Sequence, residues 1–429
     1  MMKKLLMAWA LLVIAFPNYV HAQDFNKYFV DKTLRIDYIF AGNVKQQMIA
    51  VDELNVLPHW YGKRQRLSEL PMEGNGQIIV RDHKSGDVIY KNSFSTLFQE
   101  WLSYPEAQTQ TKSFENVFLV PMPKDTVDVT LNLFNNRREV TTTLTHQVTP
   151  TDILIHHKGE HPTKYVTIQQ AADTTHCIHI AYLAEGYTAA EMDSFIKHVN
   201  EANDALFAHE PFKSMKDRFN VIAVEAVSQE SGASEPSEGI WKNTVLHSHF
   251  DTFYSDRYLT TLNLKALHDC LAGTPYEHII VLVNTEKYGG GGILNSYNLS
   301  MTRNKWFKPV VVHEFGHSFA GLADEYAYED EAIPMYPHDI EPWEPNITTL
   351  VNFHNKWENL ITKGTPIPTP PSRNPKEITR KVGVFEGAGY SLKGVYRGTQ
   401  DCRMRTNQTP EFCPVCQQAL RRVIDFYTK

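Results

Sequence analysis

Two histidines and a glutamate in this 429-residue chain are spaced so that they could act on one metal ion. In the segment His313-Glu314-Phe315-Gly316-His317, the two imidazoles lie four residues apart and therefore on the same face of a helix. Glu314 is rotated by about 100° from His313, where it can hold a water on the metal without becoming a ligand. This spacing is typical of zinc hydrolases. We predict that His313 and His317 bind Zn2+ and that Glu314 is the general base.

The residues around this motif predict a buried helix that ends at Gly321. The apolar residues Val310-Val311-Val312, Phe315 and Phe319 would bury the helix. Two histidines and a glutamate on such a helix are costly unless something satisfies them. Glycine takes the left-handed conformation that stops a helix without steric penalty. This context favours a metal site over a chance match to a short motif.

A catalytic zinc ion needs a third protein ligand, and two acidic residues follow the predicted helix. Asp324 comes three residues after Gly321, so a chain that has reversed at the glycine can bring it beneath the metal. Glu325 would point the opposite way in an extended segment. We favour Asp324 as the ligand and keep Glu325 as the alternative. The other carboxylate is expected to hydrogen-bond a ligand histidine or an arginine.

The first 22 residues predict a secretory signal peptide. Lys3 and Lys4 precede an apolar run that is too short to span a bilayer, and Val20 and Ala22 are the small residues before a cleavage site. Cleavage after Ala22 would deliver the chain to the periplasm or the outside of the cell. No later segment predicts a membrane span. A formal charge of −7 and the lack of a long basic cluster argue against nucleic acid as a partner.

The chain has five cysteines, at positions 177, 270, 402, 413 and 416. In an exported protein an odd number leaves at least one cysteine free or paired with another chain. Cys413-Pro-Val-Cys416 could be half of a zinc knuckle, but no second C-x-x-C completes a four-cysteine site. We therefore expect a structural role, with a disulfide from Cys402 to Cys413 or Cys416.

Two domains are predicted, over residues 23–160 and 161–429. The first contains short alternating strands, such as 127–133, which indicate an antiparallel β-sandwich. In the second, strands alternate with helices, which predicts an α/β (α+β) sheet upstream of the metal helix. Thr188 and Glu191 form a capping box that opens one of these helices.

Four glycines, Gly289 to Gly292, separate a predicted buried strand at 278–283 from the metal helix. Glycines at such a place let another backbone approach closely. An edge strand there could pair with an extended peptide substrate. Residues from about 330 to 380 are rich in proline and predict an irregular excursion that shapes the cleft. A terminal helix is predicted from about Pro414 to Tyr427.

The motif and its downstream residues resemble those of a known family. The segment His313–Tyr326, together with Cys402-Arg-Met404-Arg405 and Phe412-Cys413-Pro-Val-Cys416, resembles the IgA-specific metalloendopeptidases, a family of secreted bacterial zinc peptidases. The likeness covers about residues 165–428, and the β domain before it is similar to the N-terminal domain of that family.

The wider relatives of that family are the metzincins, with the motif HExxHxxGxxH/D and a methionine turn beneath the zinc. The resemblance implies a metzincin-like zinc peptidase domain in which Met404 is the turn methionine. It also implies that His313, His317 and Asp324 are the zinc ligands and Glu314 the general base. Gly321 and Asp324 each come one residue later than the metzincin spacing requires.

The function that the resemblance implies is that of an exported zinc-dependent metalloendopeptidase acting on protein or peptide substrates, among them a host immunoglobulin or other glycoprotein. The family label does not fix the substrate, because the cleft loops decide specificity. One alternative is a zinc hydrolase of cell-wall or small peptides. Another is a binding or adhesion protein with a vestigial peptidase domain, which the intact motif disfavours. Tyr288, Tyr326 and Tyr396 are candidates for stabilising the oxyanion.

Overall fold

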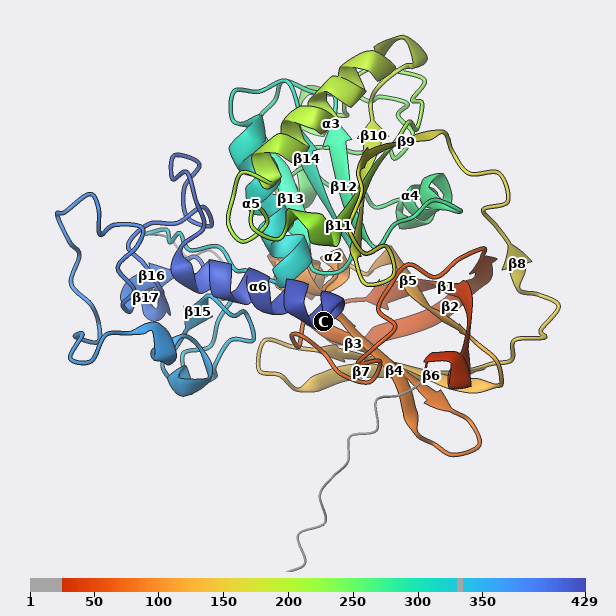
Figure 1. Cartoon of the computed structure of the whole chain (residues 1–429), viewed down its shortest axis with the longest axis horizontal. Coiled ribbons are helices and arrows are strands. Elements are labelled where there is room, and N and C mark those ends of the chain that lie inside the picture. Colours follow the sequence, from red (N-terminus) through yellow and green to blue (C-terminus); the bar gives the residue numbers. More distant parts are fainter. Residues whose placement is uncertain (1–24, 330–334) are drawn as a thin grey trace, which may run out of the picture.

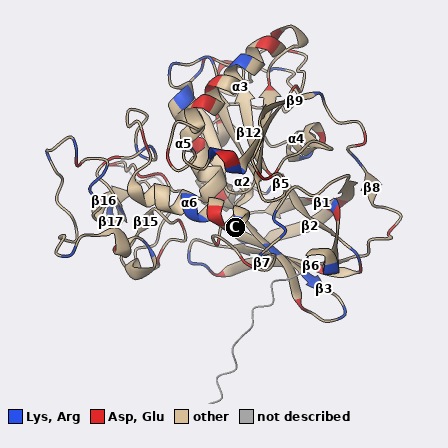
Figure 2. Cartoon of the chain, in the orientation of Figure 1, with Lys and Arg blue, Asp and Glu red and all other residues tan. Residues whose placement is uncertain are grey.

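The computed structural model describes residues 25–329 and 335–429 (Figure 1). The predicted signal peptide, residues 1–22, lies outside the described residues. Within the described residues, no helix is both long enough and apolar enough to span a membrane. Lys and Arg residues are interspersed with Asp and Glu residues along the described chain (Figure 2).

The N-terminal domain is built from two four-stranded sheets in the described part of the chain. Their strand orders are β5-β1-β2-β8 and β4-β3-β6-β7. Neighbouring strands are antiparallel, except that the short β8 runs parallel to β2. The first sheet contains β1 (Phe29–Gly42), β2 (Gln47–Leu57), β5 (Lys112–Pro123) and β8 (His156–His157). The second contains β3 (Gly76–Asp82), β4 (Val88–Phe94), β6 (Val127–Phe134) and β7 (Val140–Val148).

Apolar side chains from both N-terminal sheets meet in one core. In β6 every second residue from Val127 to Leu133 is buried, as the alternating sequence predicts. The rings of Phe94 in β4 and Phe118 in β5 have centroids 4.3 Å apart, so the facing sheets contact each other directly. Two short helices, α1 (Phe25–Tyr28) and α2 (Leu97–Trp101), complete the domain.

The second domain contains a six-stranded sheet with the order β13-β14-β12-β10-β11-β9. The four central strands are parallel, and the edge strands β13 and β9 are antiparallel to their neighbours. The strands are β9 (Tyr165–Gln169), β10 (Ile178–Glu185), β11 (Phe219–Val224), β12 (His278–Val283), β13 (Gly290–Ile293) and β14 (Tyr297–Met301). The predicted strand at 278–283 is confirmed.

The helices of this domain are α3 (Met192–Leu206), α4 (Leu264–Leu271), α5 (Phe307–Ala320) and α6 (Pro414–Thr428). The predicted capping box at Thr188 and Glu191 is confirmed, and it opens the 3-10 turn that leads into α3. Helix α3 ends at Leu206. The predicted terminal helix is confirmed as α6.

Different elements cover the two faces of the six-stranded sheet. Residues Ile178, Ile180 and Tyr182 of β10 share a core with α3, α5 and α6. The alternate residues Ala181 and Leu183 share the other core with α4 and the N-terminal sheets. Figure 1 shows α3 and α5 together on one side of the sheet and α4 on the other. All of β10 is therefore buried, as is typical of a central parallel strand, and α5 is fixed against the sheet.

Between α5 and α6 the chain makes a long excursion, at the left of Figure 1. Its described residues form a small sheet with the order β15-β17-β16 and little other regular structure. The strands are β15 (Ile347–Thr348), β16 (Phe385–Ala388) and β17 (Ser391–Arg397). The irregular excursion predicted for residues 330–380 agrees with the described part, while residues 330–334 lie outside it.

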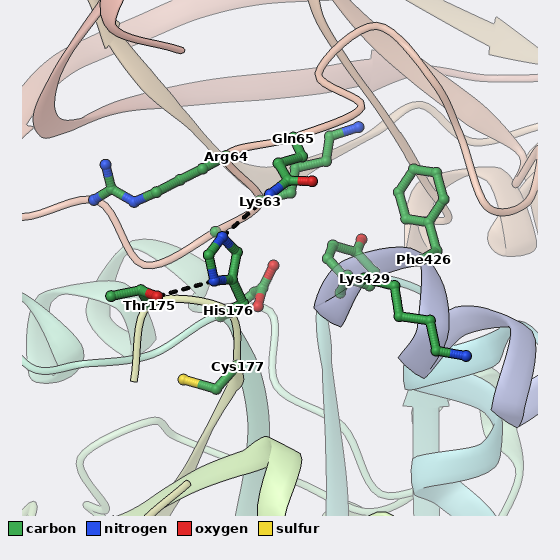
Figure 3. Close-up of a pocket in the computed structure, with 11 residues that line it drawn as sticks. Lys63, Arg64, Gln65, Thr175, His176, Cys177, Phe426 and Lys429 are labelled. Carbon is green, nitrogen blue, oxygen red and sulfur yellow. Dashed lines mark hydrogen bonds between the residues drawn. The ribbon is translucent and has the colours of Figure 1, made fainter. Parts of the chain in front are cut away.

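The N-terminal domain packs directly against the second domain. The buried Arg35 of β1 lies 2.7 Å from Asp37 and 2.6 Å from Asp269 in α4. Figure 3 shows another part of this junction, a pocket between the loop at Lys63, the segment before β10 and the end of α6. There Gln65 Nε2 lies 3.1 Å from His176 Nε2. In addition to these polar contacts, one continuous hydrophobic core contains residues of both domains and crosses the junction between them.

Candidate metal centre

Helix α5 places the two motif histidines, and its end is defined by Gly321. Gly321 adopts φ 58° and ψ 32°, the left-handed conformation predicted for it. Its N–H donates to His317 O at 3.0 Å, and the N–H of Leu322 donates to Gly316 O at 3.2 Å. These two bonds satisfy the carbonyls of Gly316 and His317 and turn the chain back toward the histidines.

The structure brings His313, His317 and Asp324 together. The Nε2 atoms of the two histidines are 3.0 Å apart, and Asp324 Oδ1 lies 3.1 Å from that of His313 and 3.3 Å from that of His317. The ligand atoms around a tetrahedral zinc ion with bonds near 2.05 Å are about 3.3 Å apart. The three atoms thus have the mutual distances of donors that share one ion.

Backbone carbonyls orient both imidazoles. The Nδ1 of His313 lies 3.0 Å from the carbonyl oxygen of Arg403, and the Nδ1 of His317 lies 2.5 Å from that of Leu322. A carbonyl oxygen can only accept, so each Nδ1 carries the proton and donates. Each Nε2 is then left with a lone pair directed at Asp324.

The Asp324 carboxylate is 7 % exposed and has two differently used oxygens. Oδ2 accepts hydrogen bonds from the hydroxyls of Tyr326 at 2.9 Å and Tyr390 at 2.5 Å. Oδ1 has no hydrogen-bond partner among the described residues and faces the two imidazoles. Burial alone would raise the pKa of this carboxyl, but positive charge on His317 and His313, when their Nε2 atoms are protonated, holds the pKa well below its usual value. An orphaned anionic oxygen beside two imidazole lone pairs fits a bound divalent cation.

Glu314 lies next to these donors, between α5 and the edge strand β13. A Cβ atom at Gly290 would stand 2.7 Å from Glu314 Oε1, and one at Gly292 would stand 2.4 Å from the Glu314 carbonyl oxygen. The predicted close approach at the glycine run is therefore confirmed. Burial raises the pKa of Glu314, and the imidazoles of His313 and His317 act in the opposite direction.

Met404 lies against the inner side of α5. It is fully buried, and its Sδ would be 2.9 Å from a Cβ at Gly316, the residue before His317. Its carbonyl oxygen accepts the N–H of Glu325 at 2.9 Å. The turn that carries Met404 is thereby joined to the segment that carries Asp324.

Two family models match this chain. The model described as IgA Peptidase M64 matches residues 166–377 and 372–424, and the model described as Peptidase M64 N-terminus matches residues 24–145. The chain belongs to the IgA peptidase M64 family. The resemblance to the IgA-specific metalloendopeptidases is thus confirmed, and M64 peptidases are metallopeptidases. No curated protein matches the chain.

In this M64 peptidase, Glu325 points away from the histidines, although it directly follows Asp324. Its Oε1 accepts from Asn346 Nδ2 at 3.0 Å and from Cys416 Sγ at 3.2 Å. The predicted hydrogen bond from a ligand histidine or an arginine is therefore wrong. The two consecutive side chains lie on opposite sides of the chain, as predicted, and Glu325 faces a group of cysteines.

The predicted disulfide is also wrong, because all five cysteines of the chain are free. Cys402 Sγ and Cys416 Sγ are 3.7 Å apart, well beyond a sulfur–sulfur bond of about 2.05 Å. Cys402, Cys413 and Cys416 do lie together, as predicted, and all three are fully buried.

The tyrosines around the M64 site differ from the predicted set. The Tyr326 hydroxyl already donates to Asp324, whereas Tyr288 OH accepts from Asn407 Nδ2 at 2.9 Å and keeps its own proton available. Tyr396 lies in β17. Tyr390, which sequence reasoning missed, donates to Asp324 from the turn between β16 and β17. No local signal marks Tyr390, because it reaches the site only through the folding of the distant excursion.

The N-terminal domain also reaches the site, which sequence reasoning did not foresee. Glu100 of α2 accepts a hydrogen bond from Tyr258 OH at 2.6 Å. Burial raises the pKa of Glu100 to about 7, and the nearby Asp324 acts in the same direction. Tyr258 in turn bridges to Gly290, on the outer edge of β13. The predicted edge strand is confirmed as β13, but part of its outer edge is already occupied.

Proposed function

We propose that this M64 peptidase is a zinc-dependent endopeptidase that cleaves internal peptide bonds of protein substrates. The observation that carries the proposal is the convergence of His313 Nε2, His317 Nε2 and Asp324 Oδ1, with Oδ1 lacking a hydrogen bond from any described residue. Two imidazoles and one carboxylate are a common ligand set of catalytic zinc sites, which keep a fourth position open. Zinc is the favoured ion because imidazole ligands suit it better than calcium or magnesium.

In this proposal His313, His317 and Asp324 hold the ion, and Glu314 moves the proton. A bound zinc ion would polarise the scissile carbonyl and lower the pKa of a bound water toward about 7. The Glu314 carboxylate takes a proton from the attacking water while the water oxygen adds to the carbonyl carbon of the scissile bond. Glu314 then gives that proton to the amide nitrogen as the C–N bond breaks, so that a carboxylic acid and a free amine leave, and the acid then ionises in water.

The substrate would lie along β13, beside Glu314. Because Gly290 and Gly292 have no side chains, this strand lies directly against α5 and Glu314. Tyr288 directly precedes the glycine run, and its hydroxyl proton is available for the developing oxyanion. The occupied edge at Tyr258 would limit how many residues of a peptide can pair with β13.

We further propose a metzincin-like catalytic domain behind a β-sandwich. The metzincin-like domain is supported by the end of α5 at Gly321, by the Asp324 carboxylate that follows it and by Met404 beneath α5. The β-sandwich is supported by the aromatic contacts between the two facing N-terminal sheets.

Export is proposed from the sequence of residues 1–22. Expression of the full chain in a bacterium with an outer membrane should yield a periplasmic or extracellular protein that begins at Gln23. Mass spectrometry of the purified N-terminus checks this expectation. A protein that stays in the cytoplasm and begins at Met1 would contradict it.

The deciding experiment compares the wild type with Glu314→Ala on a peptide library made from a whole proteome. We expect cleavage products only with the wild type, located at internal bonds of the peptides and abolished by a chelator. The matched control is Glu358→Ala, which removes an exposed glutamate far along the chain. Products confined to single terminal residues would replace the endopeptidase proposal, and a wild type without any product would overturn it.

A further inference from the structure

A second group of metal-binding side chains lies behind the first. It consists of Glu325, Cys402, Cys413 and Cys416, whose ligand atoms all lie within 4.8 Å of one another. All four residues are fully buried. None of them belongs to the donor set formed by His313, His317 and Asp324.

The distances within this group suit one tetrahedral ion. Zinc–sulfur bonds of about 2.3 Å place two thiolates about 3.8 Å apart, and mixed sulfur–oxygen pairs somewhat closer. Cys402 Sγ and Cys416 Sγ are 3.7 Å apart, and Cys416 Sγ lies 3.2 Å from Glu325 Oε1. Four protein donors would fill the coordination sphere, as is usual for structural zinc sites.

Disulfide chemistry explains the group less well than a metal does. Three buried thiols cannot all be paired, so one disulfide would leave a thiol and the Glu325 carboxylate enclosed together. Glu325 Oε2 has no hydrogen-bond partner among the described residues, and Asn346 gives Oε1 only a neutral donor. Arg397 acts on this carboxylate electrostatically but forms no ion pair with it among the described residues. A buried carboxylate without an ion pair is costly, and a divalent ion would remove that cost.

The start of α6 is built to present sulfur ligands. Cys413 is the N-cap residue of this 15-residue helix, Pro414 is its first residue, and Cys416 lies in its first turn. The backbone N–H of Cys413 donates to Cys402 Sγ at 3.3 Å, a bond that favours a thiolate. The positive end of the helix dipole also favours thiolates over thiols.

We propose that Glu325, Cys402, Cys413 and Cys416 hold a second, structural zinc ion. Cys413-Pro-Val-Cys416 is half of the site, and the other half comes from Cys402, shortly before it, and from Glu325, which is far away in the sequence. The missing second C-x-x-C is replaced by Cys402 and Glu325.

The second ion would stabilise the first site. Cys402 lies two residues before Met404, and Glu325 follows Asp324 directly. The N–H of Glu325 donates to Met404 O. The carbonyl of Arg403, which lies between Cys402 and Met404 in the sequence, orients His313. A closed zinc site at this place ties the helix α6, the Met404 turn and the Asp324 segment together.

The test is the zinc content of the full-length protein purified without chelator, measured by plasma mass spectrometry. We expect two zinc ions per wild-type chain and one in the double variant His313→Ala/His317→Ala. The remaining ion of that variant should be released by a mercurial that attacks thiolates. After cobalt substitution, the variant should show thiolate-to-cobalt charge-transfer absorption.

The cysteine variants form the second arm. Cys413→Ser should lose the thiolate-bound ion, whereas Cys270→Ser, which removes a thiol outside the group, should keep both. Should Cys413→Ser fail to fold, the double histidine variant still decides. A double histidine variant without zinc, or a disulfide joining Cys402 to Cys413 or Cys416, overturns the proposal. A wild type with one ion that the double histidine variant retains overturns the zinc-peptidase proposal and leaves this one standing.

Discussion

Asp324 and Glu325 are consecutive, yet their carboxylates face two different buried groups. Asp324 Oδ1 lies 3.1 Å from His313 Nε2, while Glu325 Oε1 lies 3.2 Å from Cys416 Sγ. The pair links the two groups through one peptide unit. A variant of Asp324 should therefore affect the histidine site, and a variant of Glu325 the cysteine group.

Asp324→Asn should weaken zinc binding at the proposed catalytic site. The amide is neutral and cannot replace the anionic oxygen, so the zinc concentration for half-maximal activity should rise more than about 100-fold. Peptide hydrolysis measured against buffered free zinc checks this expectation. Asp339→Asn, an exposed acid of the same excursion, is the control. An unchanged zinc requirement in Asp324→Asn would show that another residue is the third ligand.

Tyr390→Phe should weaken zinc binding less severely. The phenylalanine removes one of the two hydrogen bonds that orient Asp324 Oδ2, and loss of such a bond costs about 10- to 100-fold in metal affinity. The same zinc titration measures the effect. Tyr396→Phe alters a tyrosine of the neighbouring strand β17 and should leave the titration unchanged. Equal titrations for Tyr390→Phe and the wild type would contradict the role of the Tyr390 hydroxyl.

The sequence predicts those parts of the site that depend on local rules. The spacing of His313 and His317, the helix stop at Gly321 and the opposite directions of Asp324 and Glu325 each follow from backbone geometry over a few residues. The alternation in β6 and the capping box at Thr188 were predictable for the same reason.

The parts that could not be predicted depend on packing between distant segments. Tyr390 reaches Asp324 because β16 and β17 fold back onto the segment after α5. Glu325 meets Cys402 and Cys416 because α6 packs behind α5. Neither contact leaves a periodicity or a spacing in the sequence, and the lack of a second C-x-x-C suggested a disulfide where the fold gathers three thiols.

Two glycine variants should separate stability from activity. A Cβ at Gly292 would stand 2.4 Å from the Glu314 carbonyl oxygen, a backbone atom that cannot move without α5. Gly292→Ala should therefore lower the free energy of unfolding by about 1–3 kcal/mol. A Cβ at Gly290 would meet mainly the side chains of Glu314 and Val310, which can shift.

Gly290→Ala should therefore keep most of the stability and lower kcat, because it displaces the Glu314 carboxylate. Denaturant unfolding and steady-state kinetics on one peptide measure the two quantities. The pair serves as its own control, since both glycines belong to β13. If Gly290→Ala has the kcat of the wild type, Glu314 is not held against β13 in the working enzyme.

His179 should make the protein less stable in acid. Its Nδ1 donates to Tyr61 O at 3.1 Å, and its Nε2 accepts from Asn220 Nδ2 at 3.3 Å, so the neutral ring is satisfied at the domain junction. Burial lowers the pKa of His179 to about 4, the bond to the Tyr61 carbonyl opposes this shift, and the nearby Arg64 adds to it. Protonation of Nε2 would remove the hydrogen bond that it accepts from Asn220.

The sign of the pH dependence follows from this lowered pKa. Between pH 6.5 and about 4 the unfolded chain binds a proton at His179 and the folded chain does not. The stability from the neutral ring is complete above pH 6.5 and is lost as the pH falls to about 4. The loss is about 3 kcal/mol at most.

Urea unfolding at a series of pH values should therefore give a flatter profile for His179→Gln than for the wild type in this window. His278, whose pKa burial lowers to about 3, is present in both proteins and cancels in the comparison. Parallel profiles would show that His179 is not held neutral at the junction.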